Sequence, residues 1–213
     1  MTIAVFGGTG KTGRLVVQLA LAAGHKVKVL ARDPDKIPPA FGLEFVAGDA
    51  LDGGRVMATL TGCEAAVIAL GNVKGGPVDV CSRVTDLIVQ AASKTGTKTV
   101  VAMTSLGVGN SRNDVPWVFR VIGDLFLKKM MDDKAVQEDQ LRASALNWVI
   151  VRPSGLTDAP ATGQALSGTG KMMTSFPQGR TPKGQVTRAD VAAFLLATAT
   201  DGKYARQTWF LSE

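Results

Sequence analysis

Near its start the chain reads Ile3-Ala4-Val5-Phe6-Gly7-Gly8-Thr9-Gly10-Lys11-Thr12-Gly13, and this segment determines how the chain folds. Four apolar residues typical of a strand run directly into a glycine-rich turn, and a helical pattern follows. Glycines at this spacing make a tight turn, let a pyrophosphate approach the backbone, and let the helix pack closely on the strand. The helix N-terminus would offer free N–H groups and its positive dipole end to phosphate. We therefore predict a dinucleotide site at Gly7, Thr9, Gly10, Lys11, Thr12 and Gly13.

A nucleoside-triphosphate P-loop is the competing interpretation, because Gly10-Lys11-Thr12 matches the end of G-x-x-x-x-G-K-[ST]. That motif requires a glycine where this chain has Val5, inside the predicted strand. Lys11 also follows the strand too soon for the long loop that wraps a triphosphate. The P-loop interpretation is therefore excluded.

Strand-like and helix-like segments alternate along the rest of the chain. Short apolar runs predict strands at 3–6, 27–30, 43–46, 65–70, 99–103, 147–151 and 208–211. Helical patterns occupy 12–23, 56–60, 78–95, 116–144 and 188–198. The strands are apolar at every position, which indicates a sheet covered on both faces. We predict an α/β fold with a doubly wound parallel sheet of about seven strands, in a single domain over residues 1–213.

Residues 154–187 form the one region without a regular pattern. Turn chemistry is dense there, with several prolines and with Gly155, Gly163, Gly168, Gly170, Gly179 and Gly184. A long irregular segment in a compact domain is usually functional, so we expect a glycine-rich loop that borders the substrate. The alternative is a tolerated insertion. Thr187-Arg188-Ala189-Asp190 after this loop has the pattern of a capped helix start.

The residues after each strand indicate which dinucleotide binds. Arg32 comes first after the second strand and Lys36 follows within a turn, so both are candidates to hold a 2′-phosphate, which favours NADP(H). Asp33 keeps NAD open, since an acidic residue here would accept from a ribose hydroxyl. The predicted cofactor contacts after the third and fourth strands are Asp49, Ala50, Leu70 and Gly71. Asp49 has an alternative role as a helix cap or turn residue.

Composition excludes several classes of protein. Hydrophobic residues make up 46% and charged residues 20% of 213, as in a folded globular chain. The net charge is +6, but the basic residues are dispersed, so no nucleic-acid partner is expected. His25 is the lone histidine, which leaves no metal site, and Cys63 and Cys81 are expected to be buried free thiols. An apolar strand directly after Met1 and charges within 115–131 argue against a signal peptide and a membrane span, so a cytoplasmic location is expected.

A helical stripe precedes the sixth predicted strand. Its apolar residues recur at helical spacing and are Trp117, Val118, Val121, Ile122, Leu125 and Phe126. Such a stripe most often packs in the core. Alternatively, a planar substrate stacks on its exposed end, with Trp117 as the contact, or a protein partner covers it.

Taken with Met103-Thr104-Ser105 and Val151-Arg152-Pro153-Ser154-Gly155, these motifs resemble the atypical short-chain dehydrogenase/reductases over nearly the whole chain. Within that superfamily the chain is most similar to the biliverdin IXβ reductase and flavin reductase family, and it shares motifs with nitrogen-metabolite regulator-like proteins. The resemblance implies a Rossmann sheet with NADPH across the strand ends and substrate under the loop after Pro153. It also implies an active-site role for Ser105 and a ribose contact for Lys134. Thr104, Pro153 and Ser154 would border the cofactor, and Ser105 and Ser154 the substrate. For Ser105 the alternative is a hydroxyl that bonds local backbone.

One departure from the superfamily bears on the reaction. Its Tyr-x-x-x-Lys motif reads Met130-Met131-Asp132-Asp133-Lys134 here, and the one tyrosine is Tyr204. Without a phenol to protonate a carbonyl oxygen, ordinary ketone reduction is disfavoured. A flavin, bilin or quinone needs less help, because its conjugated system delocalises charge. We therefore expect an NADPH-dependent reductase of such an acceptor, and the alternative is a non-catalytic NADP(H)-binding sensor or assembly factor.

Overall fold

The computed structural model describes residues 1–72, 75–114, 127–169 and 184–213. Its strands are β1 Thr2–Phe6, β2 Lys26–Ala31, β3 Leu43–Ala47, β4 Ala65–Ile68, β5 Thr99–Met103, β6 Asn147–Pro153, β7 Gly155–Thr157, β8 Leu166–Thr169, β9 Gln185–Thr187 and β10 Gln207–Ser212. Its α-helices are α1 Lys11–Ala22, α2 Gly53–Leu60, α3 Val80–Thr95, α5 Lys128–Ala143 and α7 Arg188–Thr200. Short 3-10 helices are η1 Pro34–Lys36, η2 Gly109–Asp114 and η3 Gly202–Tyr204.

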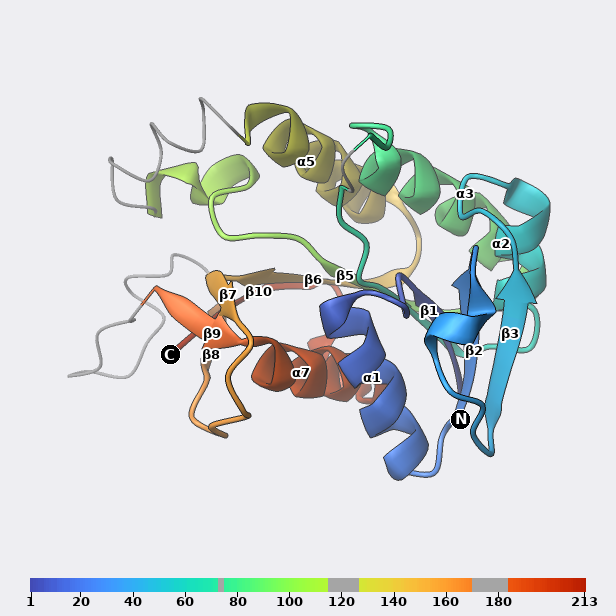
Figure 1. Ribbon diagram of the computed structural model, residues 1–213. Helices are drawn as coiled ribbons and strands as arrows, with labels where there is room; N and C mark the ends of the chain where they lie inside the picture. The colour runs from blue at the N-terminus through green and yellow to red at the C-terminus, as the bar shows by residue number, and fades with distance from the viewer. Residues whose placement is uncertain (73–74, 115–126, 170–183) are drawn as a thin grey trace.

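The predicted doubly wound sheet is confirmed. Within the described ranges, eight strands form one sheet in the order β3-β2-β1-β4-β5-β6-β10-β8, and every neighbouring pair is parallel except β10 with β8. Helices α2, α3 and α5 cover one face, and α1 and α7 cover the other (Figure 1). The chain runs outward from β1 through β2 to β3, and then from β4 in the opposite direction. The crevice between the carboxyl ends of β1 and β4 is therefore the topological switch point, where ligands bind in such sheets.

Alternate residues of each inner strand enter two separate cores. Ile3 and Val5 of β1 pack with the α1 and α7 side, whereas Ala4 and Phe6 pack with α2 and α3. Both cores exclude water, and all four of these side chains are fully buried. This arrangement explains why the strands are apolar at every position instead of every second one.

The β1–α1 turn depends on two glycines. Gly7 has a φ of +86°, and a Cβ atom there would lie 2.6 Å from the carbonyl oxygen of Ala69. A Cβ atom on Gly13 would lie 2.1 Å from the carbonyl oxygen of Gly7. Both distances are far below van der Waals contact. The first turn of α1 therefore packs against the end of β1 at a distance that only glycine permits.

The region from 154 to 187 is more regular than the sequence indicates. Strands β7 and β9 pair with each other in a small parallel sheet, and β8 adds an antiparallel edge to the main sheet. The expectation of no regular element is wrong for these strands, because each is only three or four residues long and its pairing is non-local. The main sheet accordingly has one strand more than predicted. Residues 170–183 of the predicted loop lie outside the described residues.

Of the predicted helix over 116–144, residues 128–143 form α5. The apolar stripe from Trp117 to Phe126, with its predicted substrate or partner contact, lies outside the described residues. The described part of α5 buries Asp133, Lys134, Gln137, Glu138 and Leu141, a face that is mostly polar. Hydrophobic periodicity did not predict this face, because four of its five residues are polar.

The helix cap predicted at Thr187 is confirmed. Thr187 Oγ1 accepts from the Asp190 backbone N–H at 3.0 Å, and its hydroxyl donates to Asp190 Oδ2 at 2.8 Å. The same carboxylate accepts from the backbone N–H groups of Thr162 and Gly163, both at 3.0 Å. Asp190 thus joins the start of α7 to the glycine-rich region. Burial acts to raise the pKa of Asp190, but these hydrogen bonds outweigh it and hold the pKa below its usual value.

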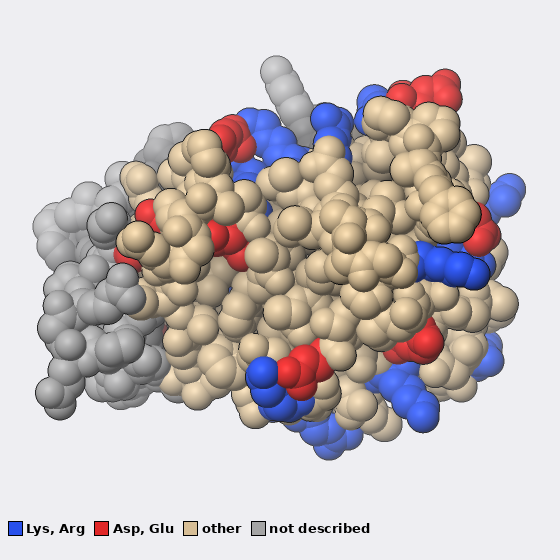
Figure 2. Space-filling view, turned by 90° about the horizontal axis from the view of Figure 1, so that it is seen from below, with Lys and Arg blue, Asp and Glu red and all other residues tan. Residues whose placement is uncertain are grey.

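The surface that α1 and α7 form is uncharged over much of its centre (Figure 2). Figure 2 shows this face with basic groups interspersed with acidic ones around its margin. In the described part of the chain no helix is long and apolar enough to cross a membrane.

Replacing Gly13 tests the close packing of the first turn. Gly13→Ala should lower the free energy of unfolding by about 1–3 kcal/mol, because the added methyl group overlaps a backbone carbonyl that cannot move freely. Gly202→Ala is the matched control, since nothing lies within 4 Å of a Cβ atom there. Urea denaturation measures both. Equal stability of the two variants would contradict the packing of this turn.

The Asp190 carboxylate gives a pH-dependent prediction. Asp190→Ala should cost about 2 kcal/mol near neutral pH, through the lost cap and the lost buried hydrogen bonds. Because the native pKa lies below the ordinary value of 3.8, this contribution is complete above 3.8 and declines as the pH falls through the depressed pKa. Urea denaturation of wild type and variant over an acid series measures the difference. Asp139→Ala, which removes an exposed carboxylate, should show a much smaller cost, and a cost for Asp190→Ala that does not depend on pH would contradict the assignment.

Candidate functional site

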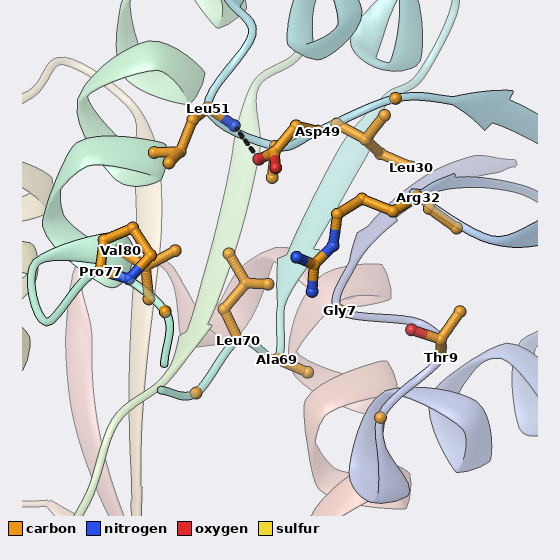
Figure 3. A pocket seen from close by; sticks show the side chains of 16 residues that line it. Gly7, Thr9, Leu30, Arg32, Asp49, Leu51, Ala69, Leu70, Pro77 and Val80 are labelled. Atoms are coloured by element: carbon orange, nitrogen blue, oxygen red, sulfur yellow. Dashed lines mark hydrogen bonds between the residues drawn. The ribbon is translucent and has the colours of Figure 1, made fainter. Parts of the chain in front are cut away.

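A pocket lies at the topological switch point predicted by the fold. It is lined by the turn after β1 and by the ends of β2, β3 and β4, with Gly76, Pro77 and Val80 closing one side (Figure 3). The cavity measures about 210 Å³. Whole-ligand pockets are usually about 300–1,000 Å³, so this one accommodates part of a dinucleotide. Its mostly apolar walls suit an adenosine moiety.

The start of α1 forms the floor of the site. Gly10 is the N-cap residue and supplies no side-chain cap, and no acidic residue lies in the first turn. The first backbone N–H groups of α1 therefore have no partner within the helix and are suited to an anion. Gly7, Thr9 and Gly10 line the pocket, whereas the Thr12 side chain is buried beneath the turn. The residues present fit a pyrophosphate.

Arg32 is the basic residue among those that line the pocket. Its guanidinium extends across the pocket between Asp49 and Thr9 (Figure 3). Within the described residues it has no ion-pair partner, and the neighbouring Asp33 pairs with Lys36 at 3.5 Å. Lys36 does not line the pocket, and its side chain is exposed in the ion pair with Asp33. An unpaired guanidinium at the end of β2 fits a 2′-phosphate.

The predicted contacts after β3 and β4 all line the same pocket, namely Asp49, Ala50, Leu70 and Gly71. Asp49 Oδ1 accepts from the Leu51 N–H at 2.9 Å, so Asp49 is a turn residue. The helix cap of α2 is Asp52, which accepts from Gly54 and Arg55. The alternative of Asp49 as a helix cap is therefore wrong, while its place in the pocket wall agrees with the cofactor assignment.

A second cluster lies at the carboxyl ends of β4 and β5. The buried Lys134 ammonium of α5 donates to the carbonyl oxygen of Met103 at 3.1 Å and to that of Leu70 at 3.5 Å. Ser105 follows Met103 by two residues, is half-buried, and donates its hydroxyl to the Leu106 carbonyl at 3.1 Å. The structure thus brings Ser105 and Lys134 to the end of the same strand, with Lys134 bonded to the pocket residue Leu70. The bond from Ser105 to Leu106 is the local backbone bond given as its alternative role, and its active-site role stays a prediction.

Three other predicted residues make contacts inside the protein. The Thr104 hydroxyl donates to Glu138 Oε1 at 2.7 Å, and the buried Ser154 hydroxyl lies 3.2 Å from that of Ser212. The Pro153 carbonyl accepts from the Leu106 N–H at 2.9 Å. These residues shape the edge at the ends of β5 and β6.

Lys11 is directed toward the region after β7. Its ammonium lies 2.6 Å from Asp158 Oδ2, and Arg188 Nη1 lies 2.6 Å from Asp158 Oδ1. Hydrogen bonding from Lys11, together with the charge of Arg188, holds the pKa of Asp158 below its usual range. This cluster connects the phosphate turn to the segment between β7 and β8. Sequence reasoning missed Asp158 and Arg188, because no motif links positions so far apart.

The buried ion pair of Glu138 and Arg152 was also missed. Arg152 lies in an otherwise apolar strand and is only 1% exposed. A charge within such a run is a signal of a buried partner, although the sequence does not identify that partner.

Several expected features can be checked directly. Tyr204 packs with Phe194 and Trp209 before β10, at the amino edge of the sheet and so away from the site. Cys63 and Cys81 are buried free thiols, as predicted, and burial raises the pKa of each to about 11. Among the described residues no group of side chains could hold a metal ion.

Comparison with known proteins identifies the family. The model of a family described as NAD(P)H-binding matches residues 7–202. An uncharacterized chloroplastic protein of Arabidopsis thaliana is 28% identical over 177 residues, which cover 76% of this chain and 61% of that protein. The chain thus spans less than two thirds of that relative's length.

Solved structures agree with this assignment. ChuY, an anaerobilin reductase from Escherichia coli O157:H7, superposes with a TM-score of 0.80 at 26% identity, over 100% of this chain and 97% of that chain. A short-chain dehydrogenase/reductase from Veillonella parvula, solved in complex with NADP, superposes with a TM-score of 0.79 at 18% identity, over 100% and 94%. The likeness to the Veillonella protein shows that the two chains share a fold. The chain therefore belongs to the NAD(P)H-binding family and has the Rossmann-type fold of the short-chain dehydrogenase/reductases.

Proposed function

We propose that this protein is an NADPH-dependent reductase of a conjugated acceptor, such as a flavin, a bilin or a quinone. The observation that carries the proposal is the arrangement of one continuous edge. Arg32, which has no ion-pair partner among the described residues, and the free N–H groups of α1 lie at one end, and Ser105 with the buried Lys134 lies at the other. This arrangement matches the two halves of a dinucleotide that lies across the carboxyl ends of the strands.

The binding roles follow from the chemistry of each group. The N–H groups at the start of α1 bind the pyrophosphate, and Gly7, Thr9 and Gly10 give it close access to the backbone. Arg32 forms charge-assisted hydrogen bonds with the 2′-phosphate, and Lys36 adds positive charge nearby. Asp49, Ala50 and Gly71 border the adenosine moiety. Lys134 donates to two carbonyl groups and also interacts with the Cys81 thiol, and we assign to its ammonium a further contact with the nicotinamide ribose.

The side chains at the ends of β4 and β5, those of Ser105 and Lys134, favour an acceptor that needs little acid catalysis. Bound NADPH supplies a hydride, which carries two electrons to the acceptor. Ser105 orients the reacting groups, and water supplies the proton that completes the reduction, because the sole tyrosine lies at the opposite edge of the sheet. A conjugated acceptor delocalises the added charge and tolerates such slow protonation. The likeness to ChuY, which is described as an anaerobilin reductase, favours a bilin within this class.

Cofactor preference tests the role of Arg32. Arg32→Ala should weaken NADPH binding by about 10- to 100-fold and leave NADH binding nearly unchanged, since only NADPH carries the 2′-phosphate. Arg83→Ala on α3 removes an exposed positive charge away from the pocket and should change neither affinity. Fluorescence titration measures both dissociation constants. Equal losses for NADPH and NADH in Arg32→Ala would contradict the assignment.

Turnover tests the reductase itself. NADPH oxidation, followed by the loss of its absorbance, should be saturable with at least one of FMN, riboflavin, biliverdin or a quinone, and slower with NADH. Ser105→Ala should lower kcat by about tenfold, as expected for loss of one orienting hydrogen bond. Ser93→Ala, on an exposed face of α3, is the control. Tight NADPH binding without turnover on any of these acceptors would contradict the enzyme and support a sensor.

A further inference from the structure

The buried face of α5 is mostly polar, and its polar groups contact the edge of the sheet that carries Ser105. Asp133 accepts from the backbone N–H groups of Cys81 and Ser82, both at 2.9 Å, and so caps the start of α3. Lys134 binds the ends of β4 and β5. Glu138, one helical turn further along, is fully buried and binds β5 and β6. Polar groups are costly to bury without partners, and Asp133, Lys134 and Glu138 all have them, whereas Gln137 bonds Thr85 through its amide nitrogen and leaves its Oε1 without a partner among the described residues.

Glu138 has a complete set of partners. Its Oε1 accepts from the Thr104 hydroxyl at 2.7 Å and from Arg152 Nε at 2.9 Å. Its Oε2 accepts from Arg152 Nη2 at 2.5 Å and from Arg142 Nη2 at 2.8 Å. Arg152 also donates from Nη1 to Asn110 Oδ1 in η2 at 2.8 Å. One carboxylate therefore connects α5, β5 and β6, and through Arg152 it reaches η2.

A contribution to stability alone does not account for this network. Well-packed apolar residues stabilise a core at least as well as a buried ion pair does. The ion pair adds a fixed geometry, because charge-assisted hydrogen bonds hold the donor groups in defined positions around the Glu138 carboxylate. The residues held in this way are the two that precede Ser105. Lys134 holds the Met103 carbonyl, and Glu138 holds the Thr104 hydroxyl.

The other side of the same segment is held by β6. The Thr104 backbone N–H donates to the Val151 carbonyl at 2.8 Å, and the Leu106 N–H donates to the Pro153 carbonyl at 2.9 Å. Ser105 thus lies in a segment that is held by two backbone hydrogen bonds to β6 and by two side chains of α5, Lys134 at Met103 and Glu138 at Thr104. Of these contacts, the one from Thr104 to Glu138 depends on a side chain that can be changed without removing sheet hydrogen bonds.

We propose that Glu138 is a positioning residue, which acts through the Thr104 hydroxyl to fix Ser105 against the nicotinamide half of the bound dinucleotide. This inference rests on the proposed function. It gives Thr104 a role that differs from direct cofactor contact, since its hydroxyl is directed into the protein. Arg152 holds the Glu138 carboxylate in the orientation that Thr104 requires.

The test removes the Thr104 hydroxyl, because substitution of Glu138 would leave the buried Arg152 without its partner and could prevent folding. Thr104→Val preserves shape and leaves Glu138 bound to both arginines. Thr104→Ser retains the hydroxyl and should restore the wild-type values. Thr97→Val is the matched control, since Thr97 is a buried threonine just before β5, whose hydroxyl donates to the Cys63 carbonyl at 2.9 Å.

Two ligands separate the halves of the site. NADPH reports on both halves, whereas adenosine 2′,5′-bisphosphate lacks nicotinamide and reports on the Arg32 pocket alone. Thr104→Val should weaken NADPH about fivefold, leave the bisphosphate within about twofold, and lower kcat about tenfold with little change in the acceptor KM. Thr97→Val should change none of these values.

The outcomes for the two proposals are distinguishable. Absence of turnover in the wild type would overturn the proposed reductase, while the ratio of NADPH to bisphosphate affinity still decides the role of Glu138. That role is overturned if Thr104→Val weakens both ligands equally or neither, if Thr104→Ser fails to restore NADPH affinity, or if Thr97→Val has the same effect.

Discussion

The close contact between Gly13 and the carbonyl oxygen of Gly7 is the constraint on which the rest of the structure depends. It brings the first turn of α1 against the end of β1, and no other residue permits that distance. The helix then begins at the switch point of the sheet, with its free N–H groups directed into the crevice. Because β2 and β4 flank β1, Arg32 and Leu70 reach the same crevice from opposite sides. The phosphate site therefore follows from backbone packing more than from any charged side chain.

The carboxyl ends of the strands form an edge with Arg32 at one end and Ser105 at the other, and different kinds of groups form these two ends. The end with Arg32 consists of strand ends and backbone, and the specificity that we propose for it depends on one exposed guanidinium. At the other end lie Ser105 and Lys134, supported by the polar face of α5. Backbone sites tolerate variation in side chains, whereas a buried polar network functions only when all its members are present. We infer that cofactor binding is the more robust property of this protein and that acceptor chemistry depends on the network around Glu138.

Much of the architecture could be predicted from the sequence, for physical reasons. The alternation of apolar strands and helices reports the two-sided burial of the sheet, and the glycine spacing reports the turn. Both signals are local. Residues such as Arg32, Asp49 and Gly71 could be assigned to one edge because parallel strands bring their carboxyl ends together. Their cofactor contacts remain predictions, although the structure places them around a common pocket.

What could not be predicted depends on pairing between distant residues. The buried face of α5 has no apolar period, so the sequence indicates its helix but not its orientation. Glu138 and Arg152, like Asp158 and Lys11, become partners only when the chain is folded. Strand β8 was missed because it is short and joins the sheet through β10.

A crystal structure with NADP⁺ bound would test the account most directly. It should show the 2′-phosphate bonded to Arg32, the pyrophosphate on the first turn of α1, and the nicotinamide beside Ser105 and Lys134. A 2′-phosphate remote from Arg32, or a nicotinamide remote from the end of β5, would contradict the account.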